Sequence, residues 1–186
     1  VQCGPLDKRA QTMTFDDKLM GELIRFVSSH EVGHTLGLRH NMGASHATPV
    51  EKLRDKAWVE AHGHTASIMD YARFNYVAQP EDKIGPKGLF PRINDYDKWA
   101  IKWGYSYRPE FKDEYEEKEA MMTETSRFLA GHPRCWFSGE GRDEDPRSQT
   151  EDLGDDNMKA NEYGVKNLKR VIAGLPQWTH QDNDQY

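Results

Sequence analysis

The sequence predicts a mainly α-helical fold with long loops. Three observations support this class: apolar residues recur at intervals of three and four over several stretches, most of these stretches begin at a capping residue, and strand signals are scarce. No internal repeat and no low-complexity tract interrupts the chain. The elements below follow from these signals in chain order.

The first predicted helix runs from Thr14 to Gly37. Thr14 is the expected N-cap, and two aspartates follow in the first turn, where their charge suits the helix dipole. Gly37 is the expected stop, because glycine readily adopts the left-handed conformation that ends helices. Residues at helical spacing give the helix one continuous face. These are Leu19, Leu23, Phe26, Val27, His30 and His34.

Two shorter helices are predicted on either side of a long loop. Thr48 and Pro49 begin the first, with proline at the first helical position, and it ends near Gly63. Repeated Pro and Gly residues over 71–92 predict a long ordered loop. The second short helix begins at Asn94 and covers 94–104.

Two longer helices are predicted in the second half of the chain, at about 110–130 and 156–173. An acidic connection that contains Pro and Gly, residues 138–156, joins them. Each helix carries an apolar stripe at helical spacing, which predicts a buried face. The stripe of the first consists of Phe111, Tyr115, Met122 and Leu129, and that of the second of Met158, Val165, Leu168 and Ile172.

The composition fits one globular domain of 186 residues, because 11% aromatic residues argue against a disordered chain. The net charge is −6 and no dense basic block is present, so neither nucleic acid nor an anionic membrane surface is an expected partner. No apolar run approaches the roughly 18 residues that cross a bilayer, and no signal peptide is recognisable. Cys3 and Cys135 could pair, but two cysteines make no disulfide framework or thiolate cluster.

The segment HEVGHTLGLRH is the most informative about chemistry. Four residues advance a helix by about 400°, so His30 and His34 lie on one face about 6 Å apart and can share a zinc ion. Glu31 places a carboxylate beside that ion. After a glycine turn, the chain can bring in His40 as a third ligand, and three neutral histidines leave one position open for water.

This pattern is specific. From the composition of the chain, HExxH arises by chance roughly 0.03 times, and the added glycine and third histidine lower that to about one in ten thousand. The alternative interpretation is a surface helix that happens to be rich in histidine. The spacing favours the metal site.

The same segment matches the HExxHxxGxxH signature of the metzincin clan of zinc peptidases. Downstream, the residues SIMDY at 67–71 resemble the Met-containing turn of that clan. The resemblance implies that Met69 forms a hydrophobic floor beneath the zinc. It also implies that Tyr71 approaches the metal and stabilises the transition state. From spacing alone, both would be interpreted as core residues.

Longer segments resemble a bacterial family of large, exported metzincin-type proteins. The resemblance implies that residues 1–104 are the C-terminal part of a metzincin catalytic domain, with zinc helix, Met-turn and following helix. Residues 105–186 would form a helical extension packed on it, and the whole protein would be exported. The matching segments are SSHEVGHTLGLRHNMGAS, SIMDYARFNYVAQPED and PRSQTEDLGDDNMKANEYGVKNLKR, while INDYDKWAIKWGY resembles the helix after the Met-turn.

One feature departs from the metzincin pattern. Metzincin catalytic domains place a twisted sheet of about a hundred residues before the zinc helix, and an edge strand of it binds the substrate. Only 29 residues precede His30 here. We therefore expect an upstream region of the same protein to complete the cleft, and the chain by itself to bind zinc but to cleave peptides slowly.

The expected function is that of a zinc-dependent endopeptidase acting on a peptide or protein. One catalytic Zn²⁺ activates water, Glu31 is the general base, and Tyr71 donates a hydrogen bond to the oxyanion. The alternative from another class is a non-catalytic, zinc-stabilised protein-binding module derived from a peptidase. Glu31 favours the enzyme, because a structural zinc has no use for a carboxylate base. A further alternative makes residues 105–186 an interaction module.

Other polar residues allow additional interpretations. Three histidines are candidate further ligands or proton shuttles, although surface positions are the favoured interpretation; they are His46, His62 and His64. Five acids are candidate calcium ligands without EF-hand spacing, and a solvated loop with a helix cap is favoured. They are Asp143, Asp145, Asp152, Asp155 and Asp156. Arg39 fits a surface charge better than a substrate clamp.

Overall fold

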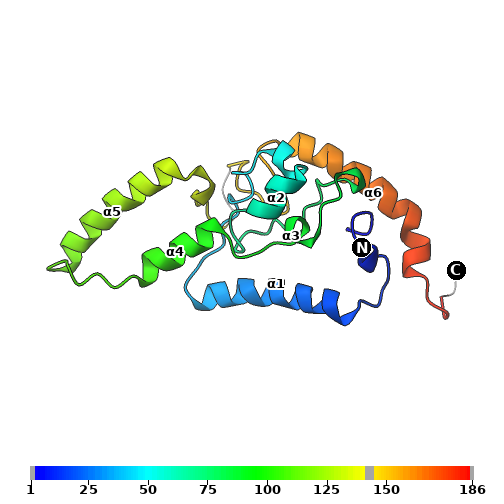
Figure 1. Cartoon of the computed structure of the whole chain (residues 1–186), viewed down its shortest axis with the longest axis horizontal. Helices are drawn as coiled ribbons and strands as arrows, with labels where there is room; N and C mark the ends of the chain where they lie inside the picture. Colours follow the sequence, from blue (N-terminus) through cyan, green and yellow to red (C-terminus); the bar gives the residue numbers. More distant parts are fainter. Residues whose placement is uncertain (1–2, 141–144, 185–186) are drawn as a thin grey trace.

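The structure, a computed structural model, describes residues 3–140 and 145–184 of the chain. Six α-helices and four short 3-10 helices are found in these ranges, and no β-strand. The predicted class, mainly α with long loops, is confirmed. Figure 1 shows an elongated molecule in which α1 follows one long side, opposite α2 and α3, while α5 projects at one end and α6 at the other.

Helix α1 (Asp17–Thr35) carries the histidine motif. Its N-cap is Asp16, whose carboxylate accepts a hydrogen bond from the Leu19 N–H at 2.8 Å. The prediction of Thr14 as N-cap was therefore two residues early, because an aspartate closer to the helix satisfies the free amides. The predicted stop is confirmed: Gly37 has φ +84°, and the Leu38 N–H returns to the Gly33 carbonyl at 3.0 Å.

The region predicted as one helix over 48–63 consists of two pieces. A 3-10 turn, Val50–Leu53, is followed by α2 (Lys56–His62). Asp55 separates them because its carboxylate caps a new helix, accepting from the Trp58 N–H at 3.1 Å. The end at Gly63 is confirmed, with φ +73°.

The loop over 71–92 is long and ordered, as predicted. It contains a 3-10 turn, Pro80–Asp82, and the single helical turn α3 (Pro86–Leu89). Helix α4 (Asp95–Tyr105) begins after Asn94, which forms a capping box with the aspartate three residues later. This start is also confirmed.

Helix α5 (Glu114–Gly131) corrects one prediction about packing. None of its residues is buried, and the predicted stripe is open to solvent at Tyr115 and Met122, which are 74% and 62% exposed. The helix projects from the body, and residues near its C-terminal end pack against a core cluster. There the Phe128 ring stacks on Trp99 with centroids 5.1 Å apart.

Helix α6 (Asn157–Thr179) corrects a second prediction about packing. It also extends six residues beyond the predicted end. All four residues of the predicted buried stripe, Met158, Val165, Leu168 and Ile172, are exposed. The buried face instead consists of Ala160, Gly164, Asn167 and Val171. The reason is the surface that the helix covers, which approaches too closely for large side chains. Gly164 lies against the Tyr76 ring, and the Asn167 amide donates to the carbonyls of Tyr76 and Ala78 at 2.9 and 2.7 Å.

The core is made of small clusters shared by both parts of the sequence. Leu53 packs in one cluster with Leu153 and Ala160, and Ala66 packs in another with Cys135. Residues beyond position 104 thus complete the core of the residues before it. Cys3 and Cys135 are both free thiols, so the pairing considered for them is not formed.

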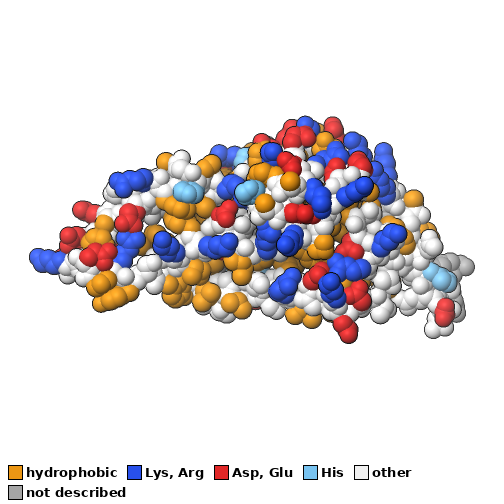
Figure 2. Space-filling model, viewed as in Figure 1, with side chains coloured by type: hydrophobic (Ala, Val, Ile, Leu, Met, Phe, Trp, Pro, Cys, Tyr) orange, Lys and Arg blue, Asp and Glu red, His pale blue; other side chains and the backbone are white. Residues whose placement is uncertain are grey.

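The surface mixes charges of both signs. Figure 2 shows basic and acidic side chains interspersed over one face, with apolar side chains gathered along α1 and near α4 and α5. In the described parts of the chain, no helix combines the length and the apolar character that crossing a bilayer requires.

Candidate metal centre

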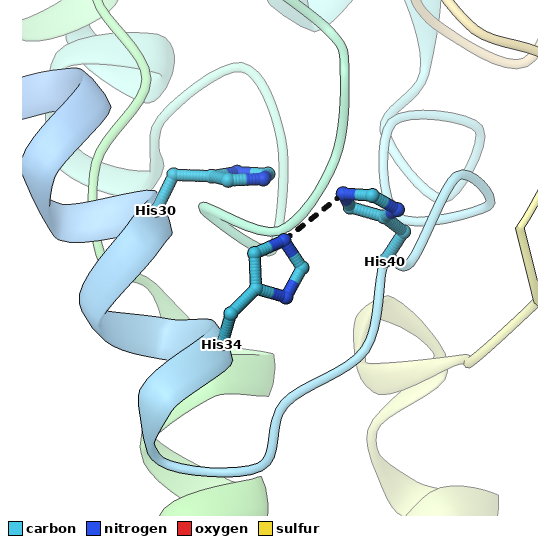
Figure 3. A group of neighbouring side chains, drawn as sticks. All are labelled: His30, His34 and His40. Atoms are coloured by element: carbon cyan, nitrogen blue, oxygen red, sulfur yellow. Dashed lines mark hydrogen bonds between the residues drawn. The ribbon is translucent and has the colours of Figure 1, made fainter.

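The three histidines of the motif lie together. His30 and His34 project from α1, and His40 reaches them from the segment that turns back after Gly37 (Figure 3). One ring nitrogen from each lies within 4.8 Å of the others. Within the residues that the structure describes, this is the one group of three such side chains placed so that it could hold a metal ion.

Hydrogen bonds to backbone carbonyls fix two of the rings. His30 Nδ1 lies 2.8 Å from the Ile68 carbonyl oxygen, and His34 Nδ1 lies 3.0 Å from that of Leu38. A carbonyl oxygen only accepts, so the proton of each neutral ring belongs on Nδ1. The opposite nitrogen, Nε2, is then left with a free lone pair, which is the form that binds a metal.

The arrangement fits a zinc ion. The Nε2 atoms of His34 and His40 face one another at 3.1 Å. Two nitrogens bound to tetrahedral zinc at about 2.0–2.1 Å would be separated by about 3.3 Å, so this pair needs little movement to bind one ion. Burial, together with His34 and His30, also lowers the pKa of His40 and so favours its neutral, metal-binding form.

Met69 packs against helix α1. It is fully buried, and its sulfur reaches α1 at Gly33, between the two histidines of the helix. A Cβ at position 33 would lie 2.4 Å from that sulfur, so only glycine allows this approach. The Asn41 N–H donates to the Met69 carbonyl at 3.1 Å, which ties the Met-turn to the residue after His40.

Asp97 holds the Met-turn from the other side. Its buried carboxylate accepts hydrogen bonds from the Ser67 hydroxyl at 2.6 Å and from the N–H groups of Ile68 and Asn94, each at 2.8 Å. Burial nevertheless raises the pKa of this carboxyl. Sequence reasoning missed Asp97, although its place three residues after the Asn94 cap was a usable signal.

Asp70, which is itself a residue of the Met-turn, is a second buried acid beside the site. It accepts hydrogen bonds from the Ser45 N–H at 2.6 Å and the Thr65 hydroxyl at 3.1 Å. Burial raises the pKa of its carboxyl well above the usual range. It therefore braces the loop after the third histidine against the Met-turn. No signal in the sequence indicated this role.

Tyr71 lies beside the histidine cluster, whereas Glu31 faces solvent. The Tyr71 ring is half-buried, with its centroid 4.6 Å from that of His40 and 5.5 Å from that of His30. The Arg73 guanidinium lies 4.9 Å from the centre of the same ring. Glu31 follows His30 on α1, where its side chain is exposed to solvent.

The other histidines do not join the cluster. His46 is half-buried and His62 is exposed. His64 contradicts the expected surface position: it is buried, its Nε2 lies 3.0 Å from the Arg73 carbonyl oxygen, and burial lowers its pKa to about 4. His64 follows the C-cap of α2 and is enclosed by later parts of the chain, such as the backbone at Arg73, which local sequence does not reveal.

The acids considered for calcium have protein partners instead. Asp145 pairs with an arginine two residues later, and Asp152 accepts from the Asn157 amide at 2.8 Å. Asp155 accepts from a backbone N–H, and Asp156 is the N-cap of α6, as predicted. Asp143 lies outside the described residues.

Comparison with known proteins gives one match. Neither the curated proteins nor the solved structures contain a sequence or fold that matches this chain. The family profile described as Met-zincin matches residues 12–186, which include the histidine motif, the Met-turn and α6. Because this match covers almost the whole chain, the protein belongs to the Met-zincin family.

Proposed function

We propose that this chain carries the metal centre of a zinc-dependent endopeptidase. The observation that carries the proposal is the convergence of His30, His34 and His40, with Nε2 lone pairs left free by the carbonyl contacts of two rings. Zinc bound there would lower the pKa of a bound water and polarise the scissile carbonyl. Three ligands leave a position open for that water, as in catalytic rather than structural sites.

Two further residues would carry the chemistry. Glu31 accepts the proton of the attacking water and returns it to the leaving amine, and its exposed position on α1 supports this role. Tyr71 donates a hydrogen bond from its hydroxyl to the oxyanion of the tetrahedral intermediate, and its place beside His40 supports that role. The substrate is a peptide or a protein.

We also propose that an upstream region of the same protein completes the cleft. Met20, Ile24 and Val27 form an apolar row on α1 that is 42–57% exposed. Glu31 continues this row by one helical turn. An upstream segment that covers these apolar residues would lie next to Glu31, the proposed general base. A substrate strand has to be held at the same place.

The test compares metal content with turnover. The purified chain should contain close to one zinc ion, and a peptide library should be cleaved. Glu31→Gln should keep the zinc and cut turnover by at least ~100-fold, the usual scale for a general base. His34→Ala should lose the zinc. Zinc retained with equal turnover in Glu31→Gln would exclude Glu31 as the general base. Zinc retained with no cleavage of any peptide by the native chain would favour the non-catalytic binding module.

A further inference from the structure

We propose that Glu140 is a positioning residue for His40, so that the segment after α5 belongs to the metal centre. The inference rests on the proposed function for the identity of the ion. It concerns the third histidine, whose ring, unlike those of His30 and His34, has no hydrogen bond to a backbone carbonyl in the described parts of the chain.

The contact geometry singles out this glutamate. Its Oε1 lies 3.7 Å from His40 Nδ1, and its Oε2 lies 3.4 Å from a guanidinium nitrogen of Arg39. Nδ1 is the nitrogen turned away from the histidine cluster, since Nε2 of His40 faces His34. A shift of about 1 Å by the half-exposed glutamate side chain would make a hydrogen bond of ordinary length.

A buried asparagine keeps Glu140 in place. Asn41, fully buried, uses its amide twice: Nδ2 donates to the Trp136 carbonyl, and Oδ1 accepts from the Ser138 N–H, each at 3.0 Å. Gly43 lies so close to Trp136 that a Cβ there would be 2.5 Å from the indole. The segment that ends at Glu140 is therefore fixed to the residue that follows His40.

The chemistry of this contact is that of an outer-shell carboxylate. A carboxylate that accepts from Nδ1–H keeps the proton on that nitrogen, orients the ring and makes Nε2 a better donor to the metal. The three rings would then share one tautomer: two held by carbonyls, and His40 held by Glu140. Loss of such a partner typically costs 10–100-fold in metal affinity.

The first measurement is zinc affinity by competition with a chromophoric chelator. We expect Glu140→Ala to weaken zinc binding 10–100-fold and Glu140→Gln, which keeps an acceptor oxygen, to weaken it less. Arg39→Ala removes the ion pair of Glu140 but not its contact with His40, and should stay within about threefold of the native protein. Glu119→Ala, an exposed acid on α5, is the control for charge alone.

The second measurement uses the metal-free chain, so it remains informative even if zinc binding fails. In the metal-free chain, the His40 proton lies either on Nδ1, towards Glu140, or on Nε2, which is 3.1 Å from His34 Nε2. The ¹⁵N chemical shifts of the His40 ring should show a larger share of the Nδ1–H tautomer in the native protein than in Glu140→Ala. Unchanged tautomers and affinity in Glu140→Ala, or an equal loss of affinity in Arg39→Ala, would overturn the proposal. A native chain that binds no zinc would instead overturn the proposed function.

Discussion

The carboxylate of Asp97 accepts a hydrogen bond from the Ile68 N–H at 2.8 Å, and the Ile68 carbonyl accepts one from His30 Nδ1, also at 2.8 Å. A residue of α4 thereby orients a histidine of α1 through one residue of the Met-turn. All three residues of this hydrogen-bond series, Asp97, Ile68 and His30, are buried.

Replacing Asp97 by asparagine should disturb these hydrogen bonds without creating a cavity. An amide has one acceptor oxygen instead of two, so at least one of the three donors loses its partner, at a cost of about 1–3 kcal/mol. We expect a lower free energy of unfolding in urea and weaker zinc binding. Asp95→Asn, on the same helix with a half-exposed side chain that pairs with Arg134, should cost less than about 1 kcal/mol. Equal stability of the two variants would contradict the role given to Asp97.

Gly33→Ala tests the approach of Met69 to helix α1. The added methyl would lie 2.4 Å from the Met69 sulfur, so we expect a loss of about 1–3 kcal/mol from overpacking. Gly21→Ala in the same helix meets no atom within 4 Å and should instead stabilise the protein by up to about 1 kcal/mol. Urea unfolding of both variants measures the two changes in unfolding free energy. Stabilisation by Gly33→Ala would show that Met69 does not pack against α1 as described.

Tyr71→Phe isolates the hydroxyl from the ring. Because only the donor to the oxyanion is lost, turnover should fall about 10–1000-fold while zinc content and melting temperature stay unchanged. Peptide cleavage, metal analysis and thermal unfolding give the three readings. Tyr107→Phe, at a tyrosine that is 89% exposed, serves as the control. A normal cleavage rate in Tyr71→Phe would mean that Tyr71 has a packing role only and does not act in catalysis.

Asp70 predicts a pH dependence of stability. Burial raises the pKa of its carboxyl, so the folded state binds the proton more tightly than the unfolded state does. The protonated Asp70 carboxyl therefore contributes its full share to the free energy of unfolding below the pKa of an unfolded aspartate, about 3.9. This contribution is lost as the pH rises through the pKa that Asp70 has in the folded protein.

The measurement is a difference between two proteins. The unfolding free energy of the native chain minus that of Asp70→Asn should fall as the pH rises from about 4 through the folded pKa. The same subtraction with Gly21→Ala, which has no titrating group, should be flat. A flat difference for Asp70 as well would show that its carboxyl titrates normally.

The proposed role of an upstream region predicts that this chain and a longer one differ in cleavage rate but not in metal binding. All three histidines and Met69 lie within this chain, so its zinc affinity should match that of a chain extended upstream by roughly 100 residues. Cleavage should be far faster in the extended chain, because orientation of the substrate can supply several kcal/mol of the barrier. Kinetics on one peptide pool decide the matter. Equal rates would mean that the loops of the short chain form the whole cleft.

The sequence predicted what depends on local geometry. The three histidines come together because helical spacing and one left-handed glycine place them, and both can be recognised within eleven residues. The starts of α4 and α6 were predictable for the same reason, since a capping side chain acts within one turn. Belonging to the Met-zincin family agrees with the resemblance found in the motif and the Met-turn.

The sequence did not predict contacts between distant segments. Asp97 orients His30 from a different helix, and Asn41 pairs with backbone that lies 95 residues later. Helical periodicity also failed for α5 and α6, because it identifies an apolar face but not the surface that covers it. His64 was misplaced on the surface for a similar reason, since burial depends on segments that fold over the turn.

The small buried face of α6 determines which substitutions the helix can tolerate. At Gly164 a methyl group would lie 3.1 Å from the Tyr76 ring, and Ala160 is completely enclosed. Outward residues such as Met158 and Ile172 should accept polar replacements almost freely. In a saturation mutagenesis experiment, the least hydrophobic side of this helix should therefore be the intolerant one, the reverse of the usual amphipathic pattern.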